Sequence, residues 1–241
     1  MDTVRAAFRD ECERLEQVLR GLTEADLDRP TPCPPWAVRD LLAHVRTGAG
    51  RLVDMLAAPA PDRAEVDAAG YFGRAKFTPE VDRDRIDSAR RAARGPAGVP
   101  GLADGFAEAW RAADAAVAAQ PSGRLVRTRH GDAMTLTEFL RTRVMEVGVH
   151  GLDLADALDR RPWLTPTAAQ VVADLLVHGR SLPPGGSRSW RGARRAELEL
   201  PPGLGWDAVT LVRKATGRSA LTDRERAVLA DADFRWLSFA P

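Results

Sequence analysis

The sequence predicts a mainly α-helical fold: a four-helix bundle with a long crossover between the second and third helices, followed by a smaller C-terminal extension. Two observations carry this prediction. Apolar residues recur every three or four positions in four long segments, which is the period of an amphipathic helix. The stretch 59–100, with scattered Pro and Gly, separates the second segment from the third, and one long connection is a known variant of such bundles.

The four bundle helices are expected where the periodic pattern is strongest. They are predicted at 2–21, 36–58, 101–120 and 135–158. Prolines come directly before the second, where the first helical positions need no amide donor. Thr135 and Glu138 open the fourth with the spacing of a capping box. The crossover is expected to hold one short helix at 80–93, and 125–128 is expected to be strand-like.

Residues 161–241 have a different composition from the bundle, so the predicted domains are 1–160 and 161–241. The extension is expected to be helical or α+β. Its predicted elements are helices at 165–179, 207–215 and 222–231 and a strand at 196–200. Between the first and second of these helices the chain is rich in Pro, Gly and Arg, which predicts irregular structure.

Composition excludes several classes of function. The chain has 35 Lys and Arg against 34 Asp and Glu, without the basic surplus of a nucleic-acid-binding protein. It contains no apolar run of membrane-spanning length and begins without the apolar core of a secretory signal. With only two cysteines, a reducing cytoplasm is the expected location, and we expect a monomer or homodimer that acts on small molecules.

Three polar residues fall inside the apolar stripe of the fourth helix when its residues are placed at about 100° intervals. They are Arg143, Glu146 and His150. A buried carboxylate is costly unless it is paired or binds a metal. Two interpretations follow: a structural Arg143–Glu146 pair at i,i+3, or a metal site.

The spacing of Glu146 and His150 suits two ligands of one metal, because residues four apart share a helix face. His44, at the edge of the apolar face of the second helix, is the candidate third ligand. Asp153 could orient His150 as a hydrogen-bond acceptor or cap the face. Three protein ligands leave one position open, as in catalytic zinc sites. A fourth ligand from His130 or the extension would instead favour a structural metal.

Two segments resemble a known family. Residues 31–44, TPCPPWAVRDLLAH, resemble the "TPCPGWTVRDLLAHL" segment of the mycothiol-dependent maleylpyruvate isomerase N-terminal-domain family, one of the DinB-like metal-binding bundles. Residues 143–155, RVMEVGVHGLDLA, resemble its R-x-x-E-x-x-x-H-x-x-D-L-A helix. The resemblance covers about 1–160. The chain departs from the pattern at Pro35, where the family usually has Gly. Residues 161–241 match the isomerase's C-terminal domain only loosely, in helical pieces and in Thr216-Gly217-Arg218.

The resemblance implies a DinB-like fold and a metal triad of His44, Glu146 and His150. It implies that the metal is typically zinc, although two histidines and a carboxylate also accommodate nickel, manganese and iron. It further implies mycothiol, the low-molecular-weight thiol of actinobacteria, as cosubstrate. The particular substrate does not follow from the fold.

We therefore expect a metal-dependent enzyme that uses a thiol as nucleophile, in S-transfer, thiol exchange or thiol-assisted isomerisation of a small electrophile. Arg143 is the predicted catalytic residue and would bind a carboxylate or sugar oxygen beside the metal. Cys33, between two prolines, is expected to pack under the second helix. Two alternatives remain: a hydrolase that uses metal-bound water, and a metal-binding or regulatory module without catalysis.

Overall fold

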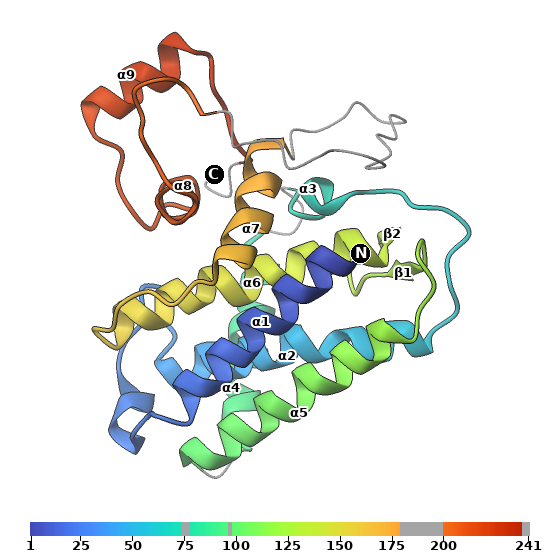
Figure 1. Ribbon diagram of the computed structural model, residues 1–241. Coiled ribbons are helices and arrows are strands. Elements are labelled where there is room, and N and C mark those ends of the chain that lie inside the picture. The colour runs from blue at the N-terminus through green and yellow to red at the C-terminus, as the bar shows by residue number, and fades with distance from the viewer. Residues whose placement is uncertain (74–77, 96–97, 179–199, 238–241) are drawn as a thin grey trace.

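Four long helices form the bundle in the computed structural model, which describes residues 1–73, 78–95, 98–178 and 200–237 (Figure 1). They are α1 (Asp2–Leu19), α2 (Val38–Ala57), α5 (Gly98–Ala118) and α6 (Leu136–Ala157). Both α1 and α2 pack against α5 and α6. The helices α1 and α2 are therefore diagonal partners, and the predicted four-helix bundle is confirmed.

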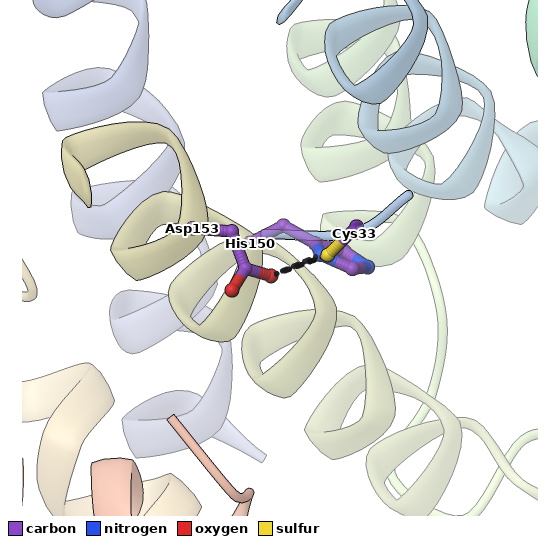
Figure 2. Close-up of side chains that lie close together, drawn as sticks. All are labelled: Cys33, His150 and Asp153. Carbon is purple, nitrogen blue, oxygen red and sulfur yellow. Dashed lines mark hydrogen bonds and ion pairs between the residues drawn. The ribbon is translucent and has the colours of Figure 1, made fainter. Parts of the chain in front are cut away.

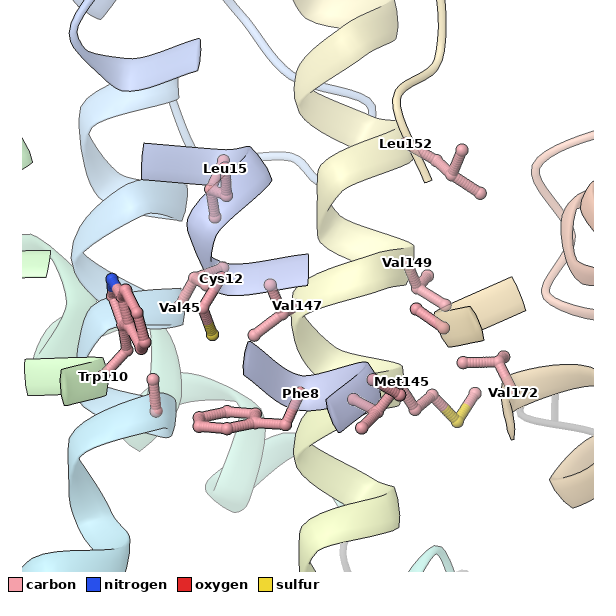
Figure 3. Close-up of a cluster of buried hydrophobic side chains, with 14 of the residues drawn as sticks. Phe8, Cys12, Leu15, Val45, Trp110, Met145, Val147, Val149, Leu152 and Val172 are labelled. Atoms are coloured by element: carbon pink, nitrogen blue, oxygen red, sulfur yellow. The ribbon is translucent and has the colours of Figure 1, made fainter. Parts of the chain in front are cut away.

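The core lies where the apolar faces of these helices meet (Figure 3). Phe8, Cys12 and Leu15 of α1 are fully buried, and Trp110 of α5 and Val147 of α6 are nearly so. Cys12 acts here as a small hydrophobic residue. The predicted apolar stripes therefore face one another, and the polar residues within the stripe of α6 are held at a packed interface.

The second bundle helix begins two residues later than predicted, at Val38. Trp36 belongs instead to the preceding loop, because its carbonyl accepts hydrogen bonds from the amide and the hydroxyl of Thr31. The Asp40 carboxylate accepts from the Ala37 amide at 3.1 Å, which satisfies one free donor at the helix start. This anchored start fixes the rotation of α2 and so the direction of His44.

The described part of the crossover holds two helices, α3 (Ala68–Tyr71) and α4 (Pro79–Ala93). The predicted helix at 80–93 is α4, which packs on α2, whereas α3 is too short to leave a periodic signal. Only half of the predicted capping box forms. The Thr135 hydroxyl accepts from the Glu138 amide, but the Glu138 carboxylate accepts from the Ala68 amide at 3.1 Å and so anchors α3 on α6. A 3₁₀ helix, η1 (Glu24–Asp28), precedes α2.

A short hairpin leads into α6. The strand β1 (Leu125–Arg127) pairs antiparallel with β2 (Ala133–Thr135). The turn between them closes through a hydrogen bond from the Thr128 amide to the Asp132 carbonyl, with Gly131 at a φ of +92°. The sequence predicted β1 only, because three residues of β2 merge into the start of the following helix.

The extension begins with α7 (Pro166–His178), which packs on α1 and α6. The helix α8 (Ala208–Ala215) packs on α7, and α9 (Asp223–Asp231) follows. All three match predicted helices. The predicted strand at 196–200 lies outside the described residues except for Leu200, which is irregular, and the domain boundary at 160 remains a prediction. None of the described helices is both long and apolar enough to cross a membrane.

Candidate metal centre

The structure brings the three predicted ligands together between α2 and α6. The Nε2 atom of His44 lies 3.4 Å from Oε2 of Glu146, and Nε2 of His150 lies 3.6 Å from the same oxygen. The ligand atoms of all three residues lie within 4.8 Å of one another. Residues that are separated by about a hundred positions in sequence thus converge because α2 and α6 pack side by side.

This donor set fits a divalent ion. Ligands at zinc distances of 2.0–2.1 Å in a tetrahedron are separated by about 3.3 Å, close to both spacings from Glu146. The three side chains stay 15–25% exposed, so an exogenous ligand can reach them. Burial lowers the pKa of His44, although Glu146 opposes this effect, so its imidazole is neutral and can bind a metal.

Glu146 is ionised in this setting. Its burial would raise the pKa, but the hydrogen bond with His44 and the charge of Arg143 outweigh that cost and hold the pKa of Glu146 well below its usual range. The Arg143 guanidinium lies 3.7 Å from Oε1, which leaves Oε2 to face the two histidines. Arg143 therefore pairs with Glu146, as one interpretation of this helix expected, and the other oxygen of the same carboxylate faces the two imidazoles that the metal-site interpretation requires.

The Asp153 carboxylate orients His150 by contacting the ring nitrogen that does not face Glu146 (Figure 2). Its Oδ2 atom lies 2.9 Å from Nδ1 of His150. An ionised carboxylate at this distance favours a proton on Nδ1 and leaves Nε2 with a lone pair that could bind a metal. Although burial opposes ionisation, hydrogen bonds with His150 and Arg218 hold the pKa of Asp153 well below its usual range. The sequence left open an orienting or a capping role, and this contact favours the first.

Arg218, in the extension, is the residue at this site that the prediction missed. Its Nε and Nη2 atoms donate to the two oxygens of Asp153 at 3.0 and 2.9 Å. Gly217 makes this possible by ending α8 with a φ of +75°. The Arg218 amide then returns to the Arg213 carbonyl and the Gly217 amide to the Lys214 carbonyl, which is the Schellman motif. The tripeptide Thr216-Gly217-Arg218 was the available signal.

Cys33 donates its thiol hydrogen to Oδ2 of Asp153 at 3.2 Å. Burial, reinforced by the charge of Asp153, raises the pKa of Cys33 to about 12, so the side chain is a neutral thiol rather than a nucleophile. Cys33, His150 and Asp153 form a second cluster with metal-ligand spacing. In this second cluster Asp153 is already bound by Arg218 and Cys33 is protonated, so the cluster of His44, Glu146 and His150 is the better candidate for a metal.

His130 belongs to neither of the clusters found among the described residues. It lies in the hairpin turn, where its Nε2 atom accepts from Nε of Arg129 at 3.1 Å, and its ring is 6.1 Å from that of Tyr71. Trp36 in turn lies against the site, with its ring 4.8 Å from the His44 ring. Hence the described part of the chain brings three candidate ligands, not four, to the His44 cluster.

The family described as the mycothiol maleylpyruvate isomerase N-terminal domain matches residues 8–155, from within α1 to the last turn of α6. The chain belongs to this family. The matched range contains α2 and α5 whole, most of α1 and α6, and the three candidate ligands, whereas Arg218 lies beyond it. The predicted family is confirmed.

Solved structures show the same fold. The crystal structure of a mycothiol-dependent maleylpyruvate isomerase is 16% identical, with a TM-score of 0.51, and the match covers 73% of this chain and 69% of that one. A histidine-to-alanine mutant of such an isomerase gives 14% identity and a TM-score of 0.50 over the same shares. No curated protein matches the chain by sequence. At these identities the structures support the DinB-like fold and leave the reaction to be argued from the site.

Proposed function

We propose that this chain is a metal-dependent enzyme that uses mycothiol as a thiol cosubstrate on a small electrophile, in thiol-assisted isomerisation or S-transfer. The metal is zinc or another divalent ion, held by His44, Glu146 and His150. The observation that carries the proposal is the convergence of two imidazole nitrogens on one carboxylate oxygen, at 3.4 and 3.6 Å. Membership of the family supports the choice of thiol.

The partial exposure of the three ligands supports catalysis over a purely structural metal. A divalent ion at this site would supply Lewis acidity that lowers the pKa of an incoming thiol, so that the nucleophilic thiolate forms near neutral pH. Cys33 does not compete as nucleophile, because its own pKa lies near 12. The protein thus provides the site for a thiol and leaves the nucleophile to come from the cosubstrate.

A thiolate can act in two ways, as a transient adduct in an isomerisation or as the group that is transferred. In an isomerisation, sulfur adds to one carbon of an activated alkene and the electron pair moves to the conjugated carbonyl. After rotation about the new single bond, the electron pair returns and expels the thiolate unchanged. In a transfer, sulfur displaces a leaving group and stays on the product. The chain's own residues hold the ligands: Asp153 fixes the His150 ring, and Arg143 faces Glu146.

The first test is the metal content of the purified chain, measured by mass spectrometry. We expect about one zinc per chain in the wild type and its loss in His44→Ala, Glu146→Ala and His150→Ala. His130→Ala is the matched control, because this histidine lies outside the clusters. Circular dichroism would show that each variant keeps its helices. A wild type that takes up no metal after reconstitution with zinc would contradict the proposal.

The second test asks whether turnover by the metal-loaded chain also requires the thiol. The zinc-loaded chain is incubated with small electrophiles, with and without mycothiol. We expect turnover only when the thiol is present. Equal turnover without thiol would instead favour the hydrolase predicted as an alternative.

A further inference from the structure

Three donor atoms of different kinds converge on the side of the His150 ring that does not face Glu146 (Figure 2). Oδ2 of Asp153 lies 3.2 Å from Sγ of Cys33 and 2.9 Å from Nδ1 of His150. The ligand atoms of these three residues lie within 4.8 Å of one another. A thiol hydrogen and an imidazole hydrogen therefore point at one carboxylate oxygen, and a single cation could replace both.

The surrounding chain holds these atoms in place before any ion binds. Asp153 and His150 lie three positions apart on α6. Cys33 comes from the loop before α2, where its amide donates to the Thr31 hydroxyl at 3.2 Å and a proline on each side restricts the backbone. The Cys33 side chain is partly exposed, so an ion can reach the sulfur from solvent.

Arg218 leaves room for an ion in this cluster. Its Nε atom donates to Oδ1 of Asp153 and its Nη2 atom to Oδ2, but each carboxylate oxygen has two lone pairs. One lone pair of Oδ2 therefore serves Cys33 and His150, or an ion that replaces their hydrogens. With the thiol ionised, two negative charges on Cys33 and Asp153 face the single positive charge of Arg218, and this balance favours a cation.

We propose that Cys33, Asp153 and His150 form a second metal site, one for a soft cation such as copper(I) or cadmium. For zinc the first cluster is the better candidate, but it offers only nitrogen and oxygen, whereas soft cations prefer sulfur. Tetrahedral ligation at zinc distances would place sulfur about 3.6 Å and the imidazole nitrogen about 3.4 Å from the carboxylate oxygen. Each of the two observed contacts would therefore open by about half an ångström.

Binding would exchange hydrogens for the ion and change no oxidation state. Cys33 keeps its hydrogen in the metal-free chain and would release it to solvent when the cation binds sulfur. The Nδ1 hydrogen of His150 would move to Nε2 if that atom is free, and leave to solvent if Nε2 already binds a metal. The second site would thus compete with the first for His150, and its occupation would break the hydrogen bond through which Asp153 orients that ring.

The experiment follows cadmium binding to the full, metal-free chain through the ultraviolet absorption of the cadmium–thiolate bond. We expect this absorption in the wild type and in His44→Ala, which lacks a ligand of the first cluster only. Cys33→Ser should lose it, whereas Cys12→Ala should keep it, because Cys12 is fully buried in the core. Zinc content is measured on the same variants, so that failure of the proposed function is distinguished from failure of the second site.

Two further variants distinguish a site with three donors from a lone thiol. We expect Asp153→Asn and His150→Ala each to raise the dissociation constant for cadmium at least about tenfold. Asp156→Asn is the matched control on α6 and should leave it unchanged, since Asp156 pairs with Arg213 instead. Circular dichroism checks that each variant keeps its helices. Absorption that is absent from the wild type, present in Cys33→Ser, or equally strong in affinity in both Asp153→Asn and His150→Ala would overturn the inference.

Discussion

Asp153 is almost completely buried, with 1% of its side chain exposed, and it contacts His150, Arg218 and Cys33 at once. We expect Asp153→Asn to raise the dissociation constant for zinc about 10- to 100-fold, the usual range when such a partner of a metal ligand is lost. The physical reason is that an amide cannot hold a proton on Nδ1 of His150 as strongly as a carboxylate. Competition with a chromophoric chelator measures the effect.

The control for this variant is Asp156→Asn. Asp156 lies one turn further along α6 and also pairs with an arginine of the extension, Arg213, at 2.8 Å. It has no contact with His150 among those described, so its replacement should leave zinc affinity unchanged. Equal zinc affinities for the two variants would mean that Asp153 does not contribute to zinc binding.

Arg143 is 4% exposed, and its Nη2 atom has no hydrogen-bond partner among the described residues. Its guanidinium lies over the Phe139 ring and 3.7 Å from Glu146. We propose that it acts on Glu146 rather than on substrate directly. On this basis Arg143→Gln should weaken zinc binding while KM at saturating zinc is unchanged. A raised KM in a variant with full zinc content would support the substrate contact predicted from the sequence.

At the scale of elements, the sequence was most informative where ionisable residues interrupt a long, periodic apolar pattern. The apolar stripe of α6 was clear over its whole length, so the placement of Glu146 and His150 within it could be recognised. The helix α3 was missed because its four residues are too few to show a periodic pattern, and β2 because it runs directly into α6. Arg218 was not predicted as a residue of the site for a different reason. Its role depends on how the extension packs on α6, and no local pattern encodes that packing.

Two helical glycines should respond oppositely to alanine. A methyl group at Gly50 would meet Ala109 at an ordinary contact distance of 3.4 Å, so Gly50→Ala should stabilise the fold by about 0.5–1 kcal/mol through helix propensity. At Gly151 it would lie 3.2 Å from Nε1 of the buried Trp163, a rigid ring in the link between α6 and α7. Gly151→Ala should therefore destabilise, by about 1–3 kcal/mol. Urea unfolding of both variants compares them, and stabilisation by Gly151→Ala would contradict this account of the contact.

The junction of α1 with α7 contains a buried carboxyl group. Glu11 is fully buried and accepts a hydrogen bond from the Thr165 amide at 2.8 Å. Its Oε1 atom and the Trp163 Nε1 atom have no partner among the described residues. Burial raises the pKa of Glu11 from 4.5 to about 7, against the opposing effects of Thr165 and the charge of Arg14, while Asp10 adds to the increase.

This raised pKa makes stability dependent on pH. Between about pH 4.5 and 7 the folded chain keeps the Glu11 proton that the unfolded chain loses, so the free energy of unfolding falls as pH rises through this window. The loss amounts to about 3 kcal/mol by pH 8. We expect Glu11→Gln to remove this decrease, whereas Glu13→Gln, an exposed change on the same helix, should keep it. Urea unfolding at pH 5 and pH 8 measures the difference, and a wild type equally stable at both would argue against a buried, protonated Glu11.

At the scale of the whole molecule, the extension contacts the helix α6, which carries two of the three candidate ligands, Glu146 and His150. Arg218 and Arg213 form ion pairs with Asp153 and Asp156, which are separated by three positions and so share one face of α6. The Arg218–Asp153 pair includes a residue that orients His150, whereas the Arg213–Asp156 pair does not. Packing of the extension is therefore coupled to the candidate metal centre through one of the two contacts.

A double-mutant cycle would measure that coupling. We expect Arg218→Gln to weaken zinc binding although it lies outside the bundle, and the Arg218→Gln/Asp153→Asn double variant to be little worse than Asp153→Asn alone. The interaction energy should be about 0.5–3 kcal/mol, as for other residues in direct contact. The same cycle on Arg213 and Asp156 should show coupling in the free energy of unfolding and none in zinc affinity. Additive effects on zinc affinity for the first pair would mean that Arg218 supports the extension alone, and that the metal centre is complete within the bundle.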